Sequence, residues 1–145
     1  PVLWVNKLDR IFLELHMPAE EAYQSFSRAI ESANVIIANY QDDLLGEISV
    51  VPEKGTVGFG SGLHGWGFTV ETFAKSYSKK LGLNRIECMR KLWGENYVSS
   101  KGKFFKSQYN KKSGKARTRA FCKLIMEPIA NLMDAVMNDK KEVYM

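Results

Sequence analysis

Four residues near the start of the chain, Asn6, Lys7, Leu8 and Asp9, have types and a spacing suited to recognising guanine. Guanine presents two adjacent donors, N1–H and the 2-amino group, and the two oxygens of one carboxylate can accept both. Asp9 is therefore the candidate base-reading residue, with the amide of Asn6 at the base edge and the stem of Lys7 over the base plane. Adenine lacks this donor pair and would leave a buried carboxylate unpaired. The competing interpretation is a polar strand-exit loop held by an Asp–Lys pair.

A second motif, Gly60-Ser61-Gly62-Leu63, follows the next apolar run. The small Gly62 would let a backbone N–H approach guanine O6 closely. Gly60 to Gly65 also match the G-x-G-x-x-G dinucleotide fingerprint, but that motif belongs in the first βα turn with an acidic residue on a second strand. The nearest acid at the required separation, Glu87, falls in a helical pattern. We therefore expect Ser61, Gly62 and Leu63 to complete one guanine site with the first motif.

Two short apolar runs, Val2–Val5 and Thr56–Phe59, predict buried strands that must carry these motifs. Apolar residues spaced by three and four between Pro18 and Tyr40 predict a long helix between the strands. Since both motifs must reach one base, the strands should be parallel neighbours whose carboxyl ends lie on the same side. Ile48–Val51 is expected to be extended, up to Pro52.

The chain after Trp66 has a different pattern, typical of helices and a short hairpin. Asn84 and Glu87 form a capping-box pattern, and Glu127 followed by Pro128 is typical of a helix start. Residues 121–126 are apolar and suit either a strand or a helix. The predicted elements are helices over Val70–Leu81, Asn84–Leu92 and Glu127–Met137, and a hairpin of Asn96–Val98 with Phe104–Gln108.

The net charge of +5 is concentrated in one segment, because eight of the 21 basic residues lie between positions 101 and 119, where no acid occurs. A local basic segment is a candidate contact for RNA phosphates. A solvated, mobile hairpin is the equally weighted alternative, with Ser107–Arg117 the part most expected to move. The candidate contact residues are Lys101, Lys103, Lys106, Lys111, Lys112, Lys115, Arg117 and Arg119.

Several chemistries have no sequence support. The chain contains no G-x-x-x-x-G-K-[ST] phosphate loop and no D-x-x-G after a strand, so no catalytic residue and no Mg²⁺ ligand are predicted. No apolar run reaches about 18 residues, so no membrane contact is expected. Cys88 and Cys122 are predicted to be separate free thiols, and neither has zinc-site spacing with His16 or His64.

The sequence resembles the elongation factor 2 family of translocation GTPases. The resemblance is strongest in Val5–Arg10 and in the block Gly55–Trp66, and it continues at Lys91-Leu92-Trp93-Gly94 and at Met126-Glu127-Pro128-Ile129. The family implies an α/β fold: a partial P-loop-type GTPase domain over residues 1–66, followed by an α+β insert subdomain over residues 67–145. It also implies that Asn6, Lys7 and Asp9 read guanine while Ser61, Gly62 and Leu63 close over the base.

The resemblance further implies a cytoplasmic GTPase that binds GTP or GDP with Mg²⁺ and promotes tRNA and mRNA translocation on the ribosome. The insert of such factors faces the ribosomal stalk proteins, so the basic residues between positions 101 and 119 are also candidate stalk contacts. The phosphate-binding elements of that family precede these motifs, so the sequence is expected to be an inactive piece of such a protein. Its exposed sheet edge is expected to favour self-association. The alternatives are a related ribosome-maturation or spliceosomal GTPase, or an RNA- or protein-binding module that uses residues 101–119 and no nucleotide.

Overall fold

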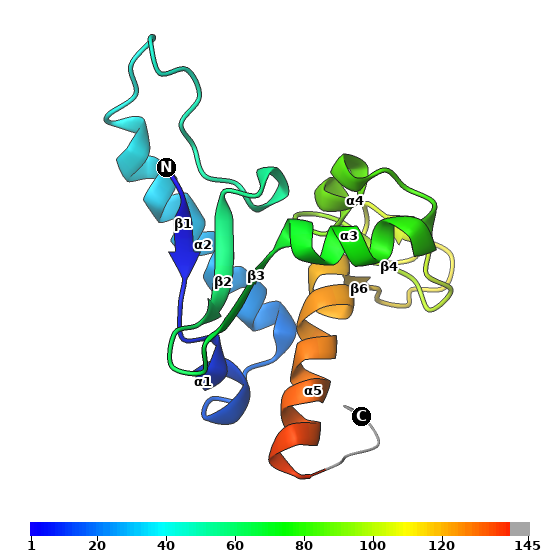
Figure 1. Cartoon of the computed structure of the whole chain (residues 1–145). Coiled ribbons are helices and arrows are strands. Elements are labelled where there is room, and N and C mark those ends of the chain that lie inside the picture. The colour runs from blue at the N-terminus through cyan, green and yellow to red at the C-terminus, as the bar shows by residue number, and fades with distance from the viewer. Residues whose placement is uncertain (140–145) are drawn as a thin grey trace.

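The computed structural model describes residues 1–139, so residues 140–145 of the predicted insert subdomain lie outside the described part. The chain is a mixture of helices and two small three-stranded sheets (Figure 1). None of the helices in this described part is both long enough and apolar enough to cross a bilayer.

The first sheet carries both predicted motifs. Strands β1 (Leu3–Val5) and β2 (Val57–Ser61) run parallel, with Leu3 opposite Val57 and Val5 opposite Phe59, which confirms the predicted pairing. A third strand, β3 (Trp66–Thr69), pairs antiparallel with β2. Strand β3 was not predicted from the sequence. Because it pairs antiparallel with β2, the glycine-rich stretch is the turn of a hairpin and not a strand-to-helix turn. The dinucleotide fingerprint therefore lacks its structural context.

Helices α1 (Leu8–Leu13) and α2 (Ala19–Ala38) connect the parallel strands. Helix α2 crosses behind the sheet (Figure 1) and buries Ala22, Tyr23, Phe26 and Ile30. Tyr23 and Phe26 are among the spaced residues that predicted this helix, and its bounds fall within the expected range. The predicted extended piece before Pro52 forms no strand. Val50 is held instead by the Asn34 side chain on α2, through bonds of 2.7 and 2.8 Å to its N–H and carbonyl.

A tryptophan lies against glycines on the face of this sheet. A Cβ at Gly58 or Gly67 would collide with the ring of Trp4, and at Gly60 it would meet the backbone of Trp66 and Gly67 as well. The glycines thus let the ring lie flat across β2 and β3, and close approach of this kind is a common reason for glycine within a strand. The ring is half exposed, at 51%.

The next helices have the predicted bounds and different caps. Helix α3 (Val70–Leu81) begins where Thr69 N–H donates to Thr72 Oγ1 at 3.2 Å, a cap that the sequence analysis missed. Helix α4 (Arg85–Lys91) begins with Asn84 Oδ1 accepting from Glu87 N–H at 2.8 Å, as predicted. Both pack against a single 3-10 turn, η1 (Pro52–Lys54).

The second sheet has the order β5-β4-β6, from β4 (Tyr97–Val98), β5 (Phe104–Phe105) and β6 (Thr118–Arg119). The β4–β5 hairpin confirms the prediction in shorter form. The chain then enters a π-helical segment, η2 (Cys122–Met126), which continues directly into α5 (Glu127–Met137). Glu127 is therefore inside a continuous helical segment, and the prediction that it caps a new helix was wrong.

One hydrophobic core spans both sides of the predicted boundary after residue 66. It joins Phe26 on α2 and Phe59 on β2 to Phe121, with ring centroids 5.6 to 6.3 Å from that ring. The boundary itself falls inside β3, between Trp66 and Gly67. The division into residues 1–66 and 67–145 stays a prediction about domain organisation, while the core is shared.

Candidate functional site

The side chain of Asn6 joins the two motif loops. Asn6 follows the end of β1, and its Oδ1 accepts one hydrogen bond from Lys7 N–H at 2.8 Å and another from Gly62 N–H at 2.9 Å. The parallel pairing of β1 and β2 makes this contact possible, because both strands end on the same side of the sheet. Two segments 56 positions apart in sequence are thereby fixed to one amide.

The backbone at Lys7 is left-handed, with φ 65° and ψ 32°. Such a conformation is uncommon for a residue with a side chain and clusters at functional sites. The Asn6 amide stabilises the turn by accepting the Lys7 N–H. The Lys7 side chain is exposed, which leaves it free to lie along a ligand surface; that it covers a base stays a prediction.

Asp9 is only 6% exposed, in the first turn of α1. Its Oδ1 is buried and has no hydrogen-bond partner within residues 1–139. A buried carboxylate oxygen without a hydrogen-bond partner lowers the stability of the fold, and a ligand with a suitable donor would supply the missing hydrogen bond. Leu8 was predicted among the base-contacting residues, but its side chain is fully buried and packs in the hydrophobic core, which fixes the loop of the first motif to the rest of the fold.

The second motif forms the turn between β2 and β3. Ser61 is buried, its Oγ accepts from His64 N–H at 3.1 Å, and its carbonyl accepts from Gly65 N–H at 2.9 Å. The Gly62 N–H is held by Asn6 and is not available to a ligand. In the described turn the Leu63 N–H makes no hydrogen bond, and the Leu63 side chain is 84% exposed. The Leu63 N–H is therefore the candidate for the backbone donor that the motif predicts for guanine O6.

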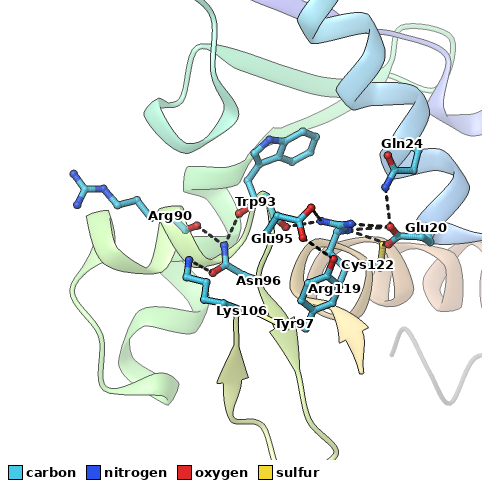
Figure 2. A network of polar contacts seen from close by, with 11 residues as sticks. Glu20, Gln24, Arg90, Trp93, Glu95, Asn96, Tyr97, Lys106, Arg119 and Cys122 are labelled. Carbon is cyan, nitrogen blue, oxygen red and sulfur yellow. Dashed lines mark hydrogen bonds and ion pairs between the residues drawn. The ribbon is translucent and has the colours of Figure 1, made fainter. Parts of the chain in front are cut away.

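Arg119 does not belong to the basic surface. Its side chain is 4% exposed and forms a bidentate pair with Glu20 on α2, at 2.9 to 3.1 Å, and its Nη1 donates to the Gly94 carbonyl at 2.7 Å (Figure 2). The central carbon of its guanidinium, Cζ, lies 4.0 Å from the ring centroid of Tyr23 and 5.0 Å from that of Tyr97. The prediction that Arg119 contacts RNA or a stalk protein was wrong, because a buried, fully engaged guanidinium is not accessible.

The Arg119 cluster also shifts the pKa of its neighbours. Burial acts to raise the pKa of Glu20, but the bonds from Arg119 and Gln24 outweigh it and hold that pKa below 4.5. Burial raises the pKa of Cys122 to about 12, and Glu20, which its thiol contacts at 3.5 Å, adds to the effect. Cys122 and Cys88 are both free, buried thiols. This is a structural cluster and not a nucleophile activated for catalysis.

Two further basic residues have structural contacts. Lys106 donates to Asn96 Oδ1 at 2.7 Å, and the Asn96 amide in turn donates to the carbonyls of Arg90 and Trp93 (Figure 2). Arg117 lies 3.7 Å from the Phe105 ring centroid. The ammonium groups of the remaining predicted residues make no hydrogen bond or ion pair within the described structure; these are Lys101, Lys103, Lys111, Lys112 and Lys115.

Residues 107–117 contain turns and one isolated antiparallel bridge, between Tyr109 and Ala116, and no helix. The expected mobility of this stretch stays a prediction. The pairing of Glu20 with Arg119 was not predicted, because nothing in the sequence pairs two residues that lie 99 positions apart.

No protein-family model matches the chain.

Proposed function

We propose that this chain reads the guanine base of GTP or GDP within a translational GTPase. The observation that carries the proposal is the Asn6 amide, which holds the Lys7 and Gly62 N–H groups at once. A polar strand-exit loop needs no such link to a second motif. A two-motif base site does, because both loops must keep a fixed position around one planar ring.

Each group around this amide has a complementary atom on guanine. The Asp9 carboxylate, with a buried oxygen that lacks a partner, accepts from N1–H and the 2-amino group. The free N–H of Leu63 donates to O6, and the stem of Lys7 covers the base plane. Adenine offers no donor pair to Asp9 and no acceptor where guanine has O6, so discrimination follows from unpaired polar groups.

We further propose that GTP hydrolysis and Mg²⁺ binding depend on the phosphate-binding elements that such GTPases carry before this region. The support is the resemblance of residues 5–10 and 55–66 to the elongation factor 2 family. Translocation on the ribosome and a cytoplasmic location belong to the same proposal.

The proposal is tested by titrating the chain with GDP, ADP and xanthosine diphosphate and following backbone amide NMR signals. We expect GDP to shift the signals of residues 6–9 and 61–63 with an affinity of about millimolar, since base contacts alone bury little ligand surface. ADP should leave them unchanged. The Asp9→Asn variant should lose GDP and gain the xanthine nucleotide, because the new amide donates to the carbonyl that replaces the 2-amino group.

The matched control is Asp43→Asn, which makes the same chemical change at an exposed position. It should leave both titrations unaltered. Equal weakening of the guanine and xanthine nucleotides in Asp9→Asn, or ADP shifts at the same amides, would contradict the assignment of Asp9.

A further inference from the structure

A polar groove of about 440 Å³ lies where the basic hairpin meets the start of the C-terminal helical segment. Its cationic lining comes from Lys115, Arg117 and Lys123, and no acidic residue lines it. Hydroxyl groups line it as well, among them those of Ser100, Ser113 and Thr118, beside Val98, Asn110 and Ala116. Ammonium and guanidinium groups only donate, and hydroxyl groups can donate, so this groove suits a ligand rich in acceptors.

The three cations differ in how far they are already engaged. Lys115 has no ion pair or side-chain hydrogen bond within the described residues, so its ammonium is free for a ligand. Lys123 pairs with Glu127 at 2.9 Å, but both side chains are about half exposed and the pair can open. Arg117 Nη1 donates to the Ser107 carbonyl at 2.8 Å, which fixes the guanidinium in position while its other nitrogens keep donor capacity.

The surface around the groove combines positive charge with exposed aromatic rings. Lys111 and Lys112 precede Lys115 on the same hairpin, and their ammonium groups make no hydrogen bond or ion pair within the described structure. Tyr109 is 57% exposed and stands opposite Ala116, which lines the groove, and Phe105 is 37% exposed beneath Arg117. Interleaved cations and exposed rings are the surface that unpaired nucleotides bind, through phosphate contacts and base stacking.

We propose that this groove binds the backbone phosphates of a single-stranded nucleic acid, with Lys115 and Lys112 on the phosphates and Tyr109 stacked on a base. An acidic peptide would satisfy the cations but would leave the ring without a partner. A duplex would offer phosphates but no unstacked base. The inference rests on the hairpin and the groove, and it stands apart from the guanine site.

The test is fluorescence anisotropy of the whole chain with labelled oligonucleotides of about 12 nucleotides, as RNA and as DNA, at several KCl concentrations. We expect binding that weakens with salt. The Lys112→Gln/Lys115→Gln variant should bind at least about tenfold more weakly at low salt. The slope of log affinity against log salt should decrease in magnitude by about 1.4, because each lost phosphate contact on a single strand accounts for about 0.7.

Two matched variants separate this site from general charge. Lys79→Gln/Lys80→Gln removes two exposed lysines from α3 and should change the affinity little. Tyr109→Ala should weaken binding about fivefold or more, while Tyr109→Phe keeps the ring and the affinity.

Binding of either the RNA or the DNA strand with these variant effects supports the proposal. Equal losses in the α3 and hairpin lysine pairs would overturn it, since the binding would then be non-specific. A blunt duplex that binds as tightly as the single strand, or a poly-glutamate peptide that competes as well as the oligonucleotide, would also overturn it.

Discussion

Replacing Arg119 by methionine removes every polar contact of this buried guanidinium and roughly keeps the length of the side chain. In the native chain this guanidinium holds Glu20, the Gly94 carbonyl and two tyrosine rings together. These groups belong to α2, to the connection after α4 and to the second sheet. We therefore expect the substitution to lower the free energy of unfolding and not merely to loosen a surface loop.

The size of the loss follows from the contacts. The charge-assisted bonds to a partly exposed carboxylate contribute about 1.5 to 3 kcal/mol in total, and the desolvated stacking on Tyr23 adds about 1 kcal/mol. Methionine recovers part of this through packing, so we expect a net loss of about 2 to 4 kcal/mol. Arg117→Met is the control, because that guanidinium is only partly buried, stacks on one ring and donates to backbone carbonyls without a carboxylate partner; it should cost about 1 kcal/mol.

Chemical denaturation measures these losses, and Glu20→Gln completes a double-mutant cycle. The glutamine leaves the buried guanidinium with only the exposed Glu95 carboxylate, 3.8 Å away, as counter-charge, which should cost about as much as removing the arginine. The double variant should therefore lose less than the two single losses combined, by about 1 to 2 kcal/mol. Additive losses, or an Arg119→Met loss no larger than that of Arg117→Met, would refute the reasoning.

The same pair predicts an acid response. Because the folded pKa of Glu20 is below its ordinary value of 4.5, its contribution is fully present above that pH and is lost as the pH falls through the lowered value. Arg119→Met should remove this part of the acid dependence while leaving the rest. Denaturation midpoints measured between neutral pH and about pH 3 test it, and an unchanged pH profile in the variant would contradict it.

Two further outcomes concern the cysteines and the glycine-rich hairpin. Cys122 and Cys88 are both buried, and burial raises the pKa of each thiol. In the folded chain at pH 8 they should react with a thiol reagent only as fast as the chain unfolds locally, whereas in denaturant they should react rapidly. Fast labelling of the folded chain would contradict their burial. Gly60→Ala should destabilise the chain by about 2 kcal/mol or more, since the new Cβ would meet backbone that cannot move aside. Gly62→Ala should cost under about 1 kcal/mol, because its Cβ would make only ordinary contacts. Thermal unfolding of the two variants compares these losses directly.

Elements with a strong periodic pattern were predictable from sequence. Helix α2 has apolar residues at steps of three and four, and α3 has the same pattern, so their bounds matched within two residues. The parallel β1–β2 pair followed from a functional argument, that two motifs must meet at one base. Short elements were harder to predict. Strand β3 contains two polar or glycine positions among four residues, and its pairing depends on the preceding hairpin turn.

The charged residues were the least predictable part of the candidate sites. Arg119 lies in a run of basic residues, and nothing local distinguishes it from Lys115 or Arg117. Its burial depends on Glu20 and on two tyrosine rings contributed by distant segments. The bond to the Gly62 N–H was likewise not predictable, because its acceptor is the side chain of a residue in the other motif. Contacts of this kind are set by tertiary structure alone.

The glycines around the candidate base site can be separated by what the fold requires of them. Gly58, Gly60 and Gly67 are needed because a Cβ would collide with Trp4 or with neighbouring backbone. Gly65 is needed because its φ is +69°, which a side chain strains. Gly62 has neither requirement: a Cβ there would lie 3.5 Å from the Asn6 amide, an ordinary contact. Packing and backbone conformation thus explain the other four positions. Neither applies at position 62, where the guanine base that we propose for this turn would supply a physical reason for glycine.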